Sequence, residues 1–156
     1  MTCANLAKID EEYAMANVFD VAEYILRKHG EMTTMKLQKL VYYSQAWSLV
    51  WDEQPLFPEA IEAWANGPVV RALYEDHRGA FRVARIGRGN PDCLTKTQQN
   101  TIDNVLKFYG DRTSQWLSDL THQEAPWKDA RADVPPGEPC NAVISHAAMA
   151  EYYGSL

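Results

Sequence analysis

The feature that most constrains the fold is a helix-forming segment, residues 35–51, that is apolar on all sides. One face carries apolar or small residues at helical spacing: Leu37, Leu40, Val41, Ser44, Trp47, Ser48 and Trp51. The opposite face is apolar as well, with Tyr42, Ala46, Leu49 and Val50. A helix that lacks a polar face is buried in the core rather than lying on the surface. We therefore expect this helix, capped by Thr33 or Thr34, to be the centre of a mainly α-helical domain.

A short strand and a tight turn follow this segment. Residues 61–65 are predicted to form a strand that ends at Asn66-Gly67, a pair that tolerates positive φ. Pro68 suits the first position of a helix, because its missing N–H would be unpaired there, and we predict a helix over residues 68–77. Residues 81–86 alternate apolar and arginine side chains, which predicts a second strand paired with the first. The expected β structure is therefore one small two-stranded antiparallel element.

The other periodic segments predict further helices around this centre. Asn17 can cap a helix that ends at Gly30, and Thr95, Thr113 and Ser145 can cap later helices. Residues 1–15 have weak periodicity and are expected to be an N-terminal arm. Residues 16–156 are expected to form a single compact domain.

Composition and charge exclude several classes of protein. The chain has 156 residues, 46% of them hydrophobic, and no apolar run approaches the roughly 18 residues that span a bilayer. We expect a cytoplasmic protein without a membrane partner. The three widely spaced cysteines, Cys3, Cys93 and Cys140, are expected to be reduced thiols. A formal net charge of −6 disfavours direct binding to nucleic acid and favours a basic partner.

Motifs that indicate catalysis are not found in the sequence. The four histidines, His29, His77, His122 and His146, are dispersed singly. No HExxH motif, paired cysteine ligands or Asp-x-Asp calcium loop is present. We expect a protein that is not an enzyme and that has no catalytic residues, no cofactor and no metal site.

Two ordered blocks of the sequence resemble a known family. The blocks are K-L-Q-K-L-x-Y-Y-x-Q-A-W at 36–47 and E-A-W-x-x-G-P-V at 62–69, with P-L-F at 55–57 between them and Tyr74 after them. They resemble the Panacea domain of SocA-like and GepA-like proteins, a family of small bacterial and phage proteins. The resemblance covers roughly Ala16 to the C-terminus. The matching positions that we assign to the structural motif are Leu37, Leu40, Trp47, Glu62, Trp64, Gly67, Pro68 and Trp127.

The resemblance implies an antitoxin. Panacea proteins are generally encoded beside unrelated small toxins, and they neutralise these toxins by direct contact. A SocA-like branch acts instead as a proteolytic adaptor that delivers its toxin to the ClpXP protease, which is the first alternative. An enzyme of unknown chemistry and a phage or mobile-element regulatory protein are further alternatives.

Aromatic and arginine side chains are the expected contacts with a protein partner, because these types dominate interface hot spots. Arg82 and Arg85 are expected to point to solvent, either as a solvated face or as contacts with an acidic partner. Gln45 is expected either in an internal network or at a recognition cleft. The full set of predicted contact residues is Tyr42, Tyr43, Gln45, Trp51, Tyr74, Arg78, Arg82 and Arg85.

Overall fold

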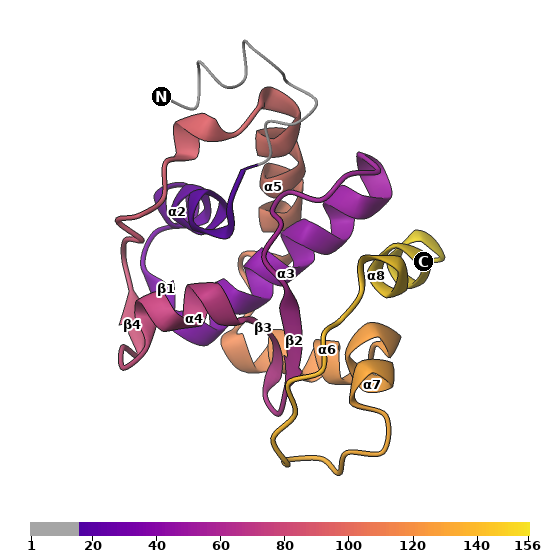
Figure 1. Cartoon of the computed structure of the whole chain (residues 1–156). Helices are drawn as coiled ribbons and strands as arrows, with labels where there is room; N and C mark the ends of the chain where they lie inside the picture. Colours follow the sequence, from indigo (N-terminus) through magenta and orange to yellow (C-terminus); the bar gives the residue numbers. More distant parts are fainter. Residues whose placement is uncertain (1–15) are drawn as a thin grey trace.

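The computed structural model describes residues 16–156, and the predicted arm at 1–15 lies outside this range. Helix α3 (Thr34–Trp51) runs through the middle of the molecule (Figure 1). Helices α2 (Val18–His29) and α5 (Lys96–Tyr109) pack on one side of it. Helices α6 (Ser114–Gln123) and α8 (His146–Gly154) pack on the other side, and α7 (Ala125–Arg131) packs against both of them. The domain is mainly α-helical, as the sequence predicts.

Helix α3 is buried around most of its circumference. Leu37 and Leu40 are fully buried, and so is the polar side chain of Lys39. The helix starts at the predicted cap, because the Thr33 side chain accepts a hydrogen bond from the Lys36 N–H. The prediction of an apolar central helix is confirmed.

Side-chain caps also fix the starts of the surrounding helices. Asn17 accepts a hydrogen bond from the Asp20 N–H, and the Asp20 carboxylate accepts one from the Asn17 N–H, which completes a capping box. Thr95, Thr113 and Ser145 cap α5, α6 and α8. These helix starts are those predicted from sequence.

The segment after Asn66 is a strand and not a helix, which corrects one prediction. β2 (Ile61–Trp64) pairs in antiparallel register with β3 (Gly67–Val70), with Ala63 opposite Pro68. The Ala63 N–H donates to the Ala142 carbonyl instead of to β3, so this pair needs no hydrogen bond from Pro68. The proline therefore fits inside the hairpin, and α4 (Arg71–His77) begins only after it.

The predicted second strand has a different partner from the one expected. β4 (Arg82–Val83) pairs with β1 (Met32–Thr33), so the protein has two separate two-stranded antiparallel sheets among its described residues. The outer edge of β2 is already occupied, since the Ile144 N–H donates to the Ile61 carbonyl and Val143 bridges to Glu62. No free edge of β2 is left for residues 81–86.

The states of the cysteines can be compared with what the composition predicted. Cys140 is a free thiol, but Cys93 is disulfide-bonded, which corrects the expectation of three reduced cysteines. Sequence spacing does not report which cysteines are close in space.

Within residues 16–156 no helix is long and apolar enough to cross a membrane. In the same range no group of three or more His, Cys, Asp or Glu side chains is placed to hold a metal ion.

Candidate partner-binding surfaces

Gln45, predicted as a possible contact residue, is fully buried. Its Oε1 accepts hydrogen bonds from the backbone N–H groups of Leu56 (2.7 Å) and Phe57 (3.3 Å). Its Nε2 donates to the Phe57 carbonyl at 2.8 Å. The side chain thus satisfies the backbone of the turn after α3, and the predicted contact with a partner is corrected to this internal role.

Tyr42 and Tyr43 are also buried, which removes them from the partner-facing set. The Tyr43 hydroxyl donates to Glu124 Oε1 at 2.6 Å, and the Tyr42 hydroxyl is 3.0 Å from that of Tyr153. Burial raises the pKa of both phenols, and the negative charge of Glu124 adds to the increase. Each hydroxyl finds its partner inside the protein, because the facing helices α7 and α8 bring polar groups that the sequence pattern does not reveal.

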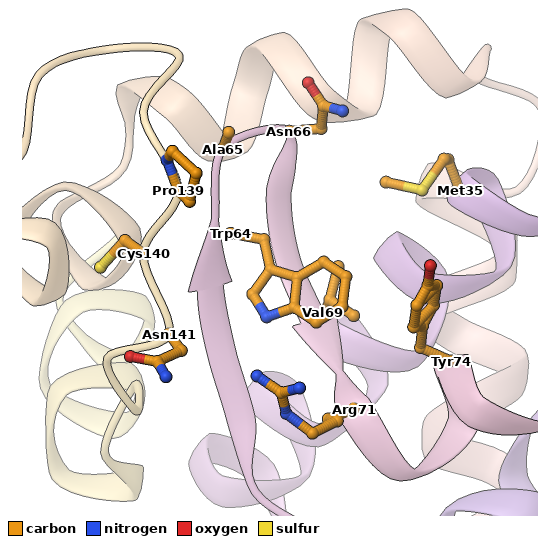
Figure 2. A pocket seen from close by; sticks show the side chains of 10 residues that line it. All are labelled: Met35, Trp64, Ala65, Asn66, Val69, Arg71, Tyr74, Pro139, Cys140 and Asn141. Atoms are coloured by element: carbon orange, nitrogen blue, oxygen red, sulfur yellow. The ribbon is translucent and has the colours of Figure 1, made fainter. Parts of the chain in front are cut away.

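The first surface hollow, which we call the hairpin groove, lies along the β2–β3 hairpin and has a volume of about 700 Å³. Figure 2 shows Trp64 at its centre, with Tyr74 of α4 and Met35 of α3 on one side. The segment from Pro139 to Asn141 forms the opposite side. Residues from four separate parts of the chain therefore meet here.

Arg71 and Glu62 fix the position of the Trp64 ring. The Arg71 guanidinium donates to both carboxylate oxygens of Glu62 at 2.9 and 2.8 Å, and the Trp64 N–H donates to the same carboxylate at 2.9 Å. These hydrogen bonds lower the pKa of Glu62, and the bonds from Arg71 contribute most. The guanidinium also lies 5.4 Å from the centre of the Trp64 ring. The indole is held in one orientation with part of its face open to the groove.

A smaller hollow of about 330 Å³ extends the hairpin groove towards Phe81. Tyr74 lies between the two hollows, its ring edge-on to Trp64 at 4.9 Å and to His77 at 5.6 Å. His77 is buried, its Nε2 is 3.0 Å from Gln38 Nε2, and burial lowers its pKa. Phe81 is 78% exposed at the far end. The two hollows together make one continuous apolar surface rimmed by Arg71 and Arg78.

Arg78, one of the three predicted arginine contacts, lines the smaller hollow. We call Arg78, the other two predicted arginines Arg82 and Arg85, and the neighbouring Arg88 the arginine ridge. All four are exposed, as expected for Arg82 and Arg85. Each lies 3.7–3.9 Å from an acidic side chain, and two of these acids, Glu23 and Glu31, come from the distant α2 region. The ridge is thus more nearly neutral than the local sequence indicates. The pairs of Arg78, Arg82 and Arg88 are loose and contribute about 0–1 kcal/mol each, so a partner can displace them. The acid beside Arg85, Glu23, is buried instead.

A buried arginine holds the segment that closes the hairpin groove. Arg131 is 3% exposed, and its guanidinium donates to the carbonyls of Ala63 (3.0 Å), Pro135 (3.0 Å) and Glu138 (2.7 Å). These bonds connect the loop after α7 to strand β2. Arg131 belongs to no motif in the sequence, and its place four residues after Trp127, on which it stacks at 5.0 Å, is the one signal that points to it.

The second hollow, which we call the tryptophan groove, has a volume of about 680 Å³ and lies between α3, α5 and α6. Its rim includes Trp51, a predicted contact residue that is 48% exposed. Trp51 stacks on Trp47 at 5.0 Å, and the Trp47 N–H donates to the Tyr109 hydroxyl at 3.1 Å. The other exposed apolar side chains of this groove are Phe108, Trp116 and Leu156. The sequence placed Trp51 but not the three residues that surround it.

The remaining structural-motif residues lie in the core or next to the hairpin. Trp127 is buried, stacks on His122 at 4.1 Å and donates its N–H to the Trp64 carbonyl at 2.8 Å. Gly67 has a φ of +123°, and its Cα faces the buried Lys39 and Thr121 side chains. The positive φ is the geometry that was predicted for the turn.

A family model described as antitoxin SocA-like, Panacea domain, matches residues 37–128, which include most of α3, the β2–β3 hairpin and Trp127. No curated protein and no solved structure matches the chain.

Proposed function

The chain belongs to the family of SocA-like antitoxins with a Panacea domain, and from this premise we propose that it neutralises a small protein toxin by direct binding in the cytoplasm. The proposed role is stoichiometric and requires no catalytic group. The partner is a protein, as the antitoxin-like family implies.

The observation that carries the proposal is the hairpin groove, with its ordered aromatic side chains beside the arginine ridge. Trp, Tyr and Arg are the residue types that dominate protein–protein hot spots. Trp64 and Tyr74 are already oriented by contacts within the chain, so binding loses little side-chain entropy at these positions. Phe81 offers a further exposed apolar contact.

The arginine ridge supports a toxin that presents acidic groups next to an apolar patch. Arg78 and Arg82 have acidic neighbours at 3.7 and 3.9 Å, which is too long for a strong hydrogen bond. An acidic toxin side chain can therefore take over these guanidinium groups at small cost. The ridge would then contribute mainly to the association rate and to the dependence of affinity on salt.

The proposal is tested by co-expression with the product of the adjacent gene, followed by calorimetric titration of the purified pair. We expect the wild-type chain to restore growth, and Tyr74→Ala combined with Arg78→Gln to weaken binding about tenfold or more. Glutamine is preferred to glutamate, because a new carboxylate near Glu75 would add a like-charge repulsion that has nothing to do with the partner.

Lys96→Gln combined with Lys128→Gln is the matched control, because both lysines are exposed and lie on other elements. This control should bind as the wild type does. Full protection without any detectable complex would contradict direct neutralisation. Wild-type affinity in the Tyr74 and Arg78 double variant would remove the hairpin groove as the toxin site.

A further inference from the structure

The tryptophan groove contains a carboxylate that has a free acceptor oxygen. Glu124 is 5% exposed, and its Oε1 accepts hydrogen bonds from the hydroxyls of Tyr43 (2.6 Å) and Tyr153 (2.8 Å). No residue of the described chain donates a hydrogen bond to Oε2 or forms an ion pair with it. Within residues 16–156 the buried side-chain atoms that lack a partner are Lys39 Nζ and His122 Nε2. Oε2 of Glu124 is not one of these atoms, so it keeps some contact with solvent, and Glu124 is among the residues that line the tryptophan groove.

The two tyrosine hydroxyls offset part of the effect of burial on the pKa of this carboxyl group. Burial raises the pKa of Glu124, and the hydrogen bonds from Tyr43 and Tyr153 act in the opposite direction. A carboxylate oxygen in such a place has lost most of its water and has not regained a partner. This arrangement is costly unless a donor arrives from outside.

Aromatic side chains line the same groove as Glu124. Trp51 is 48% exposed, Trp116 38% and Phe108 62%, and together with Leu156 they make most of the groove apolar. Glu124 is the one acidic side chain of its lining, which also includes Asn104. Aromatic faces attract cations through their quadrupole, most strongly where water is excluded. Arg112 already lies 4.5 Å from the centre of the Trp116 ring, so this rim holds a guanidinium within the chain itself.

A guest that matches both features has an apolar stem and a cationic head. Lysine and arginine side chains have this form, since their methylene groups pack on apolar surface while the charged end needs an acceptor. The net charge of −6 of the chain favours a basic partner at long range. A free small cation would leave the wide aromatic rim uncovered, whereas apolar neighbours of the lysine or arginine would cover it.

We propose that the tryptophan groove binds a lysine or arginine side chain carried on an apolar segment of a partner protein, with the cation at Glu124 Oε2 and its stem between the rings of Trp51 and Trp116. This site is separate from the hairpin groove and does not depend on the identity of the toxin. It gives the protein a second interaction surface with its own chemical selectivity.

The test is a calorimetric titration of the full chain with a pair of short amphipathic peptides. The peptides differ only at one central position, which is lysine in one and norleucine in the other. We expect the lysine peptide to bind at least about tenfold more tightly than the norleucine peptide. In Glu124→Gln this ratio should fall to about one, because the amide oxygen still accepts from both tyrosines but the charge is gone.

Two further variants keep the test decisive. Trp51→Ala should weaken the binding of both peptides. It removes a half-exposed side chain, so the variant is expected to fold. Phe81 is an exposed aromatic residue of the smaller hollow that extends the hairpin groove, and Phe81→Ala should leave the affinity for both peptides unchanged. Equal affinity of the two peptides for the wild type, or no binding of either at about 1 mM, overturns the proposal. Self-association that Trp51→Ala abolishes would also overturn it, by assigning the groove to a second copy.

Discussion

Replacement of Lys39 by methionine should stabilise the protein and change how its stability depends on pH. Lys39 is fully buried in α3, and its Nζ has no hydrogen-bond partner among residues 16–156. Burial lowers the pKa of this amine from 10.5 to about 7. Methionine has a similar length and shape but no ionisable group. Lys39→Met therefore removes the free-energy cost of burying the amine and keeps the packing.

The direction of the pH effect follows from proton binding. Between pH 7 and 10.5 the unfolded chain holds a proton on Lys39 that the folded chain has largely released, so stability increases as the pH increases through this window. Below this window both states are protonated and the cost is at its maximum. With about 1.4 kcal/mol per pKa unit, the Lys39 cost at neutral pH is roughly 4 kcal/mol, and it decreases by about 1–3 kcal/mol between pH 7 and 9.

The assay is urea unfolding followed by tryptophan fluorescence at several pH values between about 7 and 9. We expect Lys39→Met to be more stable than the wild type by about 2–4 kcal/mol at neutral pH, with the difference shrinking as the pH rises. The neighbouring His122 has a lowered pKa, so it is neutral throughout this window and does not contribute. Lys107→Met, at an exposed position of α5, is the control and should show no such trend. Parallel stability curves for the wild type and Lys39→Met would refute the reasoning.

Two other substitutions test the turn and the core. Gly67→Ala should lower the free energy of unfolding by about 2–6 kcal/mol, through backbone strain at positive φ and through overpacking. The φ of Gly67 is +123°, and the added Cβ would lie 2.4 Å from Lys39 Cε. Gly30→Ala is the control, because Gly30 has a φ of +101° but open space around it, so this variant should lose only the contribution of strain. Equal losses of stability at both glycines in thermal melting would exclude the packing contribution. Gln45→Leu should cost about 2–4 kcal/mol in urea unfolding, because it leaves the N–H groups of Leu56 and Phe57 unpaired; an unchanged midpoint would show that these groups find other acceptors.

Local features of the fold were accessible from sequence because they depend on neighbouring residues. The apolar pattern of residues 35–51 predicted a buried helix, and Asn17, Thr95, Thr113 and Ser145 marked helix starts that the structure confirms. Gly67 marked the turn, because positive φ is a property of a single residue. Periodicity and caps are encoded within a few positions, so a single chain suffices to find them.

The candidate surfaces were only partly accessible, because burial depends on segments that are distant in sequence. The type of residue at position 45 is common in recognition sites, but the structure shows that both ends of the Gln45 amide bond to the turn at Leu56 and Phe57. Trp51 was predicted as a contact, but Phe108 and Trp116 join it only through the packing of α5 and α6 on α3.

The sequence by itself determined where the capped helices begin, which helix is buried and where the chain must turn. The tertiary structure alone decided which edges pair and which side chains reach the surface. Pro68 could start a helix or lie within a strand, and the choice was made only by the hydrogen bond from the Ala63 N–H to Ala142, far along the chain. Glu124 likewise has one oxygen without a donor because α3 and α8 each bring a tyrosine hydroxyl to its other oxygen, Oε1. Local preferences fix backbone geometry, but competition for hydrogen-bond partners is resolved only when distant segments meet.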